Sequence, residues 1–131
     1  MTSATRYFAA FAALALAVAT GLGAWASHGL GAILSAAALR SVETAIDYQF
    51  FHSLGLLALA AIQKFRNASA TLLASQCAIA VGTVLFCGGV YASSFDGPAI
   101  IASAAPVGGV VLILGWLAAA IGLLTSDKAD A

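Results

Sequence analysis

The sequence predicts an all-α polytopic membrane protein, a compact bundle of four transmembrane helices. Of its 131 residues, 63% are hydrophobic and only 8% are charged, and the mean hydropathy is +1.05. The few charges fall in short gaps between long apolar runs. A hydrocarbon core about 30 Å thick needs about 20 apolar residues in a helix that rises about 1.5 Å per residue. The chain supplies that length four times, so we expect residues 1–131 to form a single membrane domain.

Four apolar runs give the expected spans. The first contains no ionisable side chain except Tyr7, and the second is interrupted only near its start, by Asp47 and His52. The third and the fourth carry no charged residue. Because the connections between them are short, consecutive helices are expected to pack as neighbours in an up-and-down bundle. The expected spans are residues 7–26, 45–62, 70–92 and 106–124.

The segment between the first two spans, residues 29–44, is rich in leucine and alanine and contains one arginine, Arg40. This composition predicts a short interfacial helix that lies along the membrane surface.

The distribution of basic residues predicts the orientation. Four of them lie on the side that holds both termini and the middle connection, and only Arg40 lies on the other. Positive charge favours the cytoplasmic side, so both termini are expected there. The four residues are Arg6, Lys64, Arg66 and Lys128.

The first run has an alternative interpretation as a secretory signal. Arg6 precedes an apolar stretch that ends in the small-x-small pattern at residues 24–26. Cleavage there would leave three spans and move the new amino terminus outside, and the charge distribution alone does not decide between the two.

Small residues recur at helical spacings and predict where helices approach closely. In the first span Gly21 ends a four-residue repeat of alanines, and in the third Gly82 ends another. In the fourth, glycines recur every seven residues, at Gly108, Gly115 and Gly122. Packing within the bundle is the expected role. The alternative is that one stripe faces a second copy or another membrane protein.

The two cysteines, Cys77 and Cys87, are ten residues apart on one predicted helix. That spacing is about 15 Å along the axis, too far for a disulfide within the helix. We interpret both as small packing residues.

Polar side chains gather at the expected non-cytoplasmic face. Tyr48, Gln49 and His52 are three and four residues apart, so they share one face of the second span. A polar face at that depth needs partners, and His28 and Tyr91 are the candidates. The candidate cluster is His28, Glu43, Asp47, Tyr48, Gln49, His52 and Tyr91.

Three interpretations of this cluster stay open. The first is a hydrogen-bonded network that fixes helix register, and the second is binding or transport of a small molecule or proton. The third is ligation of haem or a metal by His28 and His52. No His-x-x-x-His or Cys-x-x-Cys spacing supports the third, so no cofactor is expected. We also expect no catalytic residue, since serine and histidine neighbours on a helix do not face each other. No basic patch for nucleic acid is present.

Two segments resemble the signatures of a known family. Residues 23–30 resemble Gly-Ala-Phe-Gly-Ala-His-Gly-Leu, with Ala26 and Ser27 as departures. Residues 43–54 resemble its second signature in order and spacing, with Glu-Thr-Ala, then Tyr-Gln, then His-x-Leu. The family is the small bacterial inner-membrane proteins catalogued as domain-of-unknown-function family four hundred and twenty-three, with mitochondrial transmembrane relatives.

The resemblance extends through most of the chain. Residues 86–91 resemble a Phe-Ser-Gly-Ser-Leu-Tyr segment, with Cys87 and Gly89 in place of serines, and residues 106–109 with Gly115-Trp116 resemble the fourth-span signature. The resemblance implies four helices in the inner membrane with an uncleaved first span, and it implies no established reaction.

We therefore expect a small structural or accessory component of the inner membrane that is not an enzyme. Its expected partners are the lipid bilayer and either further copies of itself or a larger membrane complex.

Overall fold

The computed structural model describes residues 3–66 and 69–125, and all the elements in them are helical. Lys128, which contributed to the expected orientation, lies outside these residues. Four long helices are apolar enough to cross a membrane, the last of them together with the short helix α4. The predicted all-helical, four-span fold is confirmed. The elements are α1 (Ser3–His28), the 3₁₀ turn η1 (Leu30–Ala32), α2 (Ala36–Gln63), α3 (Ala70–Ser94), α4 (Ala99–Ala102) and α5 (Ala104–Thr125).

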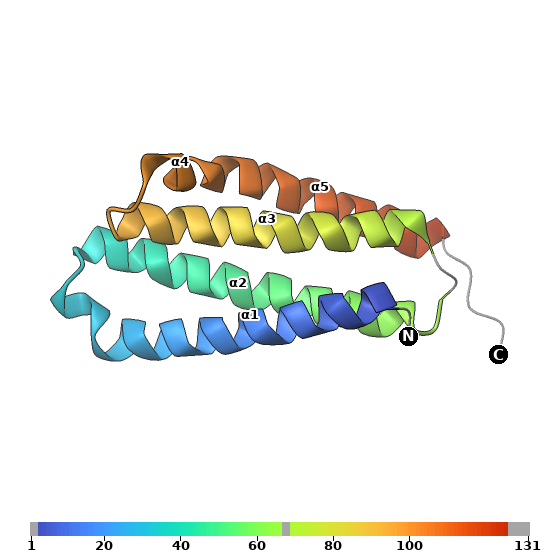
Figure 1. The fold of residues 1–131 in the computed structure, drawn as a ribbon, viewed down its shortest axis with the longest axis horizontal. Coiled ribbons are helices and arrows are strands. Elements are labelled where there is room, and N and C mark those ends of the chain that lie inside the picture. The colour runs from blue at the N-terminus through green and yellow to red at the C-terminus, as the bar shows by residue number, and fades with distance from the viewer. Residues whose placement is uncertain (1–2, 67–68, 126–131) are drawn as a thin grey trace.

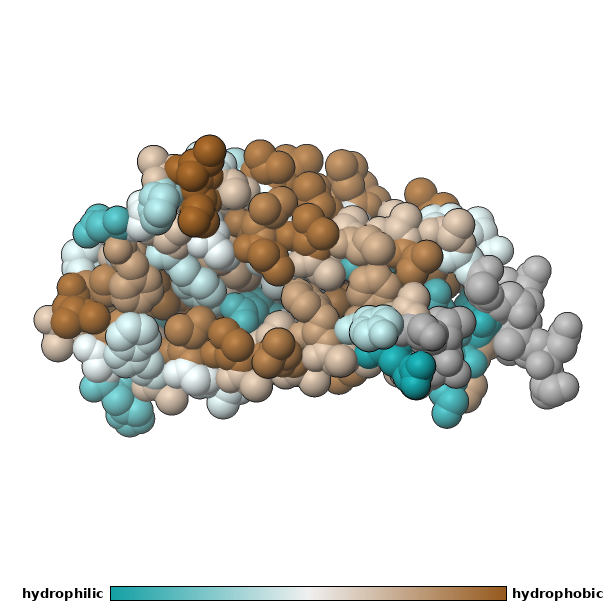
Figure 2. Space-filling view, viewed as in Figure 1, coloured by the Kyte–Doolittle hydropathy of each residue, from teal (hydrophilic) through white to brown (hydrophobic). Residues whose placement is uncertain are grey.

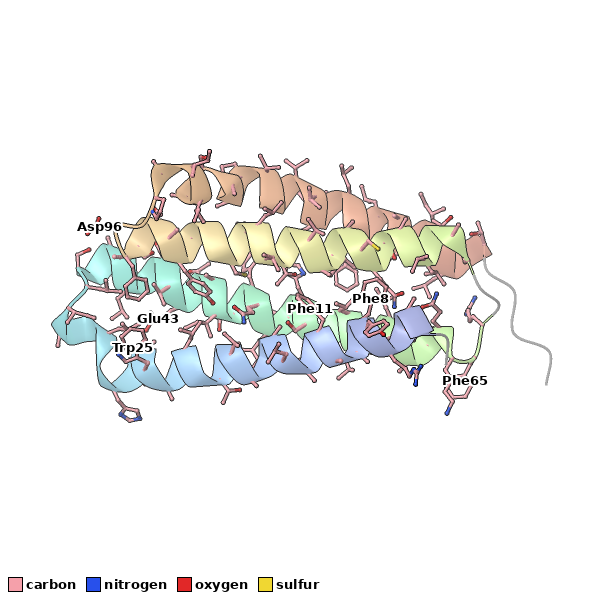
Figure 3. The ribbon with its side chains drawn as sticks, viewed as in Figure 1. Phe8, Phe11, Trp25, Glu43, Phe65 and Asp96 are labelled. Carbon is pink, nitrogen blue, oxygen red and sulfur yellow. The ribbon has the colours of Figure 1, made fainter. Side chains whose placement is uncertain are left out.

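The long helices run up and down, so the connections gather at two ends (Figure 1). We call one the His28 end, where α1 meets α2 and α3 meets α4. The other, the Arg66 end, holds the start of α1, the α2–α3 connection and the end of α5. In the order of packing, α2 lies against α1 and α3, and α3 lies against α2 and α5. Figure 3 shows Asp96 and Phe65 in connections at these opposite ends.

The prediction of an interfacial helix at residues 29–44 is wrong. Ser35 caps the amino end of α2, where its hydroxyl accepts a hydrogen bond from the amide of Ala38 at 3.2 Å. From Ala36 the helix continues for 28 residues without a break, so residues 36–44 are its first turns. At about 1.5 Å per residue α2 is about 42 Å long, which exceeds the hydrocarbon thickness. Between α1 and α2 lie only the three-residue turn η1 and a short irregular stretch on either side of it.

Glycines bring α3 and α5 into close contact. A Cβ added to Gly82 would lie 2.8 Å from Leu112 Cγ, and one added to Gly115 would lie 3.0 Å from Ile79 Cγ1. The glycines at the closest approaches of this interface are buried, and the seven-residue repeat of α5 faces α3 along its length. They are Gly82, Gly89, Gly108, Gly115 and Gly122.

Gly21 does not take part in such packing within the chain. It is exposed, and no atom lies within 4 Å of the position that its Cβ would occupy. The repeat that ends at Gly21 includes Ala13 and Ala17, which are also exposed, because it follows the side of α1 that faces away from α2. The alanines that α1 buries are a different set: Ala12, Ala15, Ala19 and Ala26.

The surface agrees with a membrane location. Figure 2 shows hydrophobic side chains over α5 and over the middle of the visible face, with most hydrophilic ones toward the two ends. At the His28 end the rings of Trp25 and Phe95 stack with centroids 5.7 Å apart. Aromatic side chains are enriched at membrane interfaces, so this pair is placed where an interfacial belt is expected.

Candidate functional site

The most polar part of the bundle lies at its mid-depth. Gln49 Nε2 donates a hydrogen bond to the carbonyl of Ala15 at 2.8 Å, and Trp116 Nε1 donates to His52 Nδ1 at 2.9 Å. Ala15 is in the middle of α1, Trp116 is in the middle of α5, and Gln49 and His52 are in the middle of α2. Since all three helices place these residues about halfway along, the side chains lie about midway between the two ends of the bundle.

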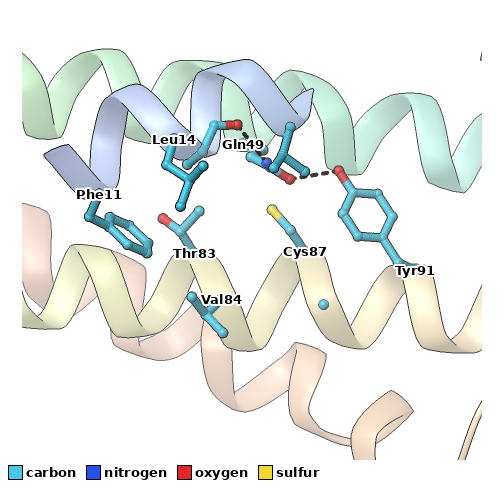
Figure 4. Close-up of a pocket in the computed structure, with 10 residues that line it drawn as sticks. Phe11, Leu14, Gln49, Thr83, Val84, Cys87 and Tyr91 are labelled. Atoms are coloured by element: carbon cyan, nitrogen blue, oxygen red, sulfur yellow. Dashed lines mark hydrogen bonds between the residues drawn. The ribbon is translucent and has the colours of Figure 1, made fainter. Parts of the chain in front are cut away.

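Gln49 connects three helices. Its Oε1 accepts a hydrogen bond from the Tyr91 hydroxyl of α3 at 2.9 Å, while its Nε2 binds the backbone of α1 (Figure 4). Four residues earlier on α2, the carbonyl of Ala45 accepts from the Cys87 thiol at 3.4 Å. Because no water is present at this depth, each of these contacts satisfies a group that would otherwise be costly to bury. The two hydrogen bonds of Gln49, which we call the Gln49 tie, therefore fix the register of α1, α2 and α3.

A groove of about 260 Å³ opens beside this tie, between α1 and α3. These two helices approach each other over only a short stretch, and α2 closes the groove from behind. Its outer walls carry Leu14, Val18 and Val84, which are 66%, 47% and 56% exposed. The residues that line the groove are Phe11, Leu14, Ala15, Val18, Gln49, Thr83, Val84, Cys87, Gly88 and Tyr91.

The polar groups that line the groove are engaged within the protein. Thr83 Oγ1 donates to the carbonyl of Ile79 at 2.7 Å, and Gln49, Tyr91 and Cys87 are paired as described above. Each of these side chains thus has a partner within the protein, and the walls of the groove are mostly apolar. Such a lining suits a hydrocarbon chain rather than an ion.

An aromatic patch lies on an adjacent face of α2. His52 and Gln49 are three residues apart and so project only about 60° apart around α2. Gln49 bonds toward α1 and Tyr91, whereas His52 bonds to Trp116 of α5. The rings of Tyr48 and His52 are 5.6 Å apart, those of Tyr48 and Phe86 are 5.0 Å apart, and those of His52 and Trp116 are 6.1 Å apart. We call Tyr48, His52, Phe86 and Trp116 the aromatic patch.

Three predicted site residues lie elsewhere. His28 and Glu43 are exposed toward the His28 end, where they line a shallow hollow of about 370 Å³. Asp47 lies near the middle of α2 but is exposed on the side of the helix roughly opposite Gln49. Glu43 precedes His52 on the same helix by about 13 Å of axial rise. The structure thus does not bring the seven candidate residues together, because α2 begins at Ala36 and places His52 at mid-depth.

The proposed pairing of His28 and His52 on haem or a metal loses its geometric basis for the same reason. In the described part of the chain no group of three or more histidine, cysteine, aspartate or glutamate side chains is arranged to hold a metal ion.

Sequence reasoning missed most of the groove lining and half of the aromatic patch, including Thr83, Phe86, Trp116 and the backbone of Ala15. Trp116 offered a signal, since it is the one aromatic residue of the aliphatic fourth span. No local pattern distinguishes the carbonyl of Ala15 from those of its neighbours.

Comparison with known proteins identifies the family. The family described as "Protein of unknown function (DUF423)" matches residues 22–109. The chain belongs to this family. The matched residues include all of α2 and α3, which supply Gln49, His52 and Tyr91, and they exclude Trp116.

Relatives cover nearly the whole chain. A UPF0382 membrane protein of Haemophilus influenzae is 37% identical over 82% of this chain and 85% of its own length. The UPF0382 inner membrane protein YgdD of Escherichia coli K12 is 34% identical over 95% of this chain and 92% of its own length. The UPF0382 membrane protein YwdK of Bacillus subtilis is 29% identical over 86% and 91%. No solved structure matches the chain. Together with the four spans, these relatives make it a multi-pass protein of the inner membrane.

Proposed function

We propose that the protein is an accessory component of the inner membrane that binds the hydrocarbon chain of a lipid-soluble molecule between α1 and α3. The observation that carries this proposal is the groove of about 260 Å³ at mid-depth, with apolar walls and engaged polar groups. A groove that opens sideways at this depth faces lipid, so a hydrocarbon chain is the occupant that its surroundings supply. The proposed role is binding rather than catalysis.

The Gln49 tie supports the proposal because it makes the groove a fixed shape. Gln49 holds α1 through Ala15 and α3 through Tyr91, so the two walls stay at a set spacing. A site that is formed before its ligand arrives does not lose binding free energy in ordering itself.

Gly88 provides a direct test. It lines the groove, and nothing lies within 4 Å of the position that its Cβ would take, so Gly88→Leu fills the groove without disturbing the packing. The matched control is Ala74→Leu, also on α3, where Ala74 is exposed and does not line the groove. Both variants are reconstituted in nanodiscs with a phosphatidylcholine that carries a diazirine on one acyl chain. Cross-linked residues are then counted by mass spectrometry.

We expect adducts on Phe11, Thr83 and Gly88 in the unmodified protein, with a loss of several-fold in Gly88→Leu and no change in Ala74→Leu. Adducts on the exposed face of α5, at Ile113 and Leu117, serve as an internal reference that neither variant alters. Equal labelling of the groove in both variants, relative to that reference, would contradict the proposal.

Self-association is a second candidate, favoured by the outward repeat of Ala13, Ala17 and Gly21 on α1. Small residues at four-residue spacing allow two membrane helices to approach closely. Gly21→Leu is then expected to lower the dimer fraction measured by native mass spectrometry from nanodiscs. Ala120→Leu, at an exposed site of α5, is expected to leave it unchanged. A monomer in every sample would count against this candidate.

We also propose that the Arg66 end is cytoplasmic. Arg6, Lys64 and Arg66 lie at that end, and Arg40 is the basic residue near the other. The test is a topology reporter fused after residue 131 and, separately, inserted in the connection at residues 33–34. Cytoplasmic signal from the inserted reporter would reverse the orientation.

A further inference from the structure

The aromatic patch contains a hydrogen-bond donor whose identity the structure fixes. An indole N–H can only donate, so the bond of 2.9 Å from Trp116 Nε1 requires a lone pair on His52 Nδ1. Nδ1 therefore carries no proton. In the neutral imidazole the proton must then be on Nε2, which is a donor.

The Nε2 atom of His52 has no hydrogen-bond partner in the described part of the chain. His52 is half-buried, and its recorded hydrogen bond is the one that Nδ1 accepts. The buried side-chain atoms that lack a partner there are Ser53 Oγ and the two polar atoms of Gln76. Because Nε2 has no partner among the described residues and is not one of these buried atoms, it is exposed at the protein surface.

The depth of His52 limits what could accept from Nε2. The residue lies level with the middle of α5, where no bulk water is present to pair with an exposed N–H. The ester carbonyls of phospholipids lie at the edge of the hydrocarbon core, about 15 Å from its centre. An acceptor from the bilayer would therefore belong to a molecule that carries oxygen into the core itself.

A second copy of the chain is the rival source of that acceptor. Carbonyls within its helices already accept from amides four residues later and offer only their second lone pair, as those of Ala15 and Ala45 do here. The side-chain oxygens of Gln49 and Thr83 are paired within their own chain, but those of Asp47 and Tyr48 are exposed, so the test below includes a second copy on the patch as an outcome.

The rings around His52 add a second recognition element. Tyr48 is 45% exposed beside the imidazole, its ring packs against Phe86, and Trp116 lies on the other side of His52. Aromatic faces favour a flat conjugated partner through offset stacking. An N–H donor within an aromatic surface suits a planar ring that bears a carbonyl.

We propose that the aromatic patch binds the head of a quinone-type molecule dissolved in the bilayer, with His52 Nε2 donating to one of its carbonyl oxygens. The site is distinct from the groove, because it involves the helix α5 and none of its four residues lines the groove. Trp116 is a positioning residue in it, since it sets the tautomer of His52.

The test uses the full-length protein in nanodiscs and a decyl-substituted benzoquinone with ¹³C at both ring carbonyls. Infrared difference spectra report a carbonyl that accepts a hydrogen bond as a band shifted to lower frequency. We expect such a band to saturate at one quinone per chain. It should persist in His52→Gln, whose amide can accept from Trp116 and still donate outward. It should also persist in Gly88→Leu, where only the groove is filled.

The variant that removes the hydrogen bond carries both substitutions, His52→Leu and Trp116→Phe. Removing both partners avoids an unpaired indole N–H, which could unfold the single variant. We expect quinone affinity to fall about tenfold, as for loss of one hydrogen bond in an apolar site, and the shifted band to disappear. A band that persists in the double variant overturns the proposal, and so does its absence from the unmodified protein. Cross-linking that shows a second copy seated on the patch in the quinone-free protein also overturns it.

Discussion

Trp116 of α5 donates its indole N–H to His52 of α2 across 2.9 Å, although α3 lies between these two helices in the order of packing. The contact is possible because Gly55 has no side chain where the Trp116 ring lies, as a Cβ there would collide with it. One large side chain thus joins helices whose backbones remain apart. It also gives His52, an ionisable residue in the middle of a span, a defined partner.

The strength of this link is measurable by a double-mutant cycle. Trp116→Phe removes the donor and His52→Leu removes the acceptor. Interhelical hydrogen bonds in membranes contribute about 0.6 kcal/mol on average and at most about 1.7 kcal/mol. We expect a coupling energy within that range from reversible unfolding in mixed detergent and SDS micelles. Additive effects of the two changes would show that the bond does not contribute.

The Gln49 tie leads to a second stability prediction. Gln49→Leu leaves the hydroxyl of the partly buried Tyr91 without its acceptor, whereas Tyr91→Phe leaves Gln49 with its bond to Ala15. We expect Gln49→Leu to cost about 1–3 kcal/mol of unfolding free energy, and Tyr91→Phe to cost less. The double variant should lose little more than Gln49→Leu alone. The same SDS titration measures all three, and a larger loss in Tyr91→Phe than in Gln49→Leu would refute this account.

The parts of the fold that the sequence predicts are those set by local composition. The four spans follow from apolar length, and the glycine repeat of α5 marks a face that packs on α3. The start of α2 was misplaced because Arg40, Glu43 and Asp47 resemble the charged edge of a span. Ser35, a good amino-terminal cap ten residues before the expected start at residue 45, was the overlooked signal.

The candidate site was harder to predict because its contacts join different helices. Tyr48, Gln49 and His52 were correctly placed on one helix, but which neighbour each meets depends on helix rotation and register. The error of nine residues at the start of α2 placed His52 near a membrane face. His28 was then expected to meet it, although the two lie at different depths.

Gly108 gives a sharper prediction about packing. A Cβ there would collide with the backbone at Phe86, whereas one at Gly21 would meet nothing within 4 Å. We expect Gly108→Ala to lower the unfolding free energy by about 1–3 kcal/mol through forced separation of α3 and α5. Gly21→Ala should not lower it. Since alanine has the higher helix propensity, comparable losses in the two variants would show that close approach at Gly108 does not control the effect.

The turn after α3 offers a substitution that should stabilise. Asp96 has a φ of 52°, in the left-handed region that favours glycine, and the next amide, of Gly97, donates to the carbonyl of Ala92 at 2.7 Å. Asp96→Gly relieves the conformational cost at this position, and we expect a gain of up to about 1 kcal/mol. Asp96→Val, which is branched at Cβ, should lose stability in the same assay. A gain in the valine variant would exclude backbone strain as the cause.

Gln76 is the clearest case of a side chain that reduces stability. It is 1% exposed on α3, and neither its amide nitrogen nor its amide oxygen has a hydrogen-bond partner in the described part of the chain. An unpaired amide in an apolar interior costs about 1–3 kcal/mol on the scale of protein substitutions. Gln76→Met has a similar shape without the polar atoms, so we expect it to raise the unfolding free energy by that amount. Gln76→Glu, which keeps the length and adds the possibility of charge, should lower it. If the methionine variant is instead less stable, the amide must be paired in the membrane, and internal water bound at Gln76 becomes the explanation to test by water-edited NMR.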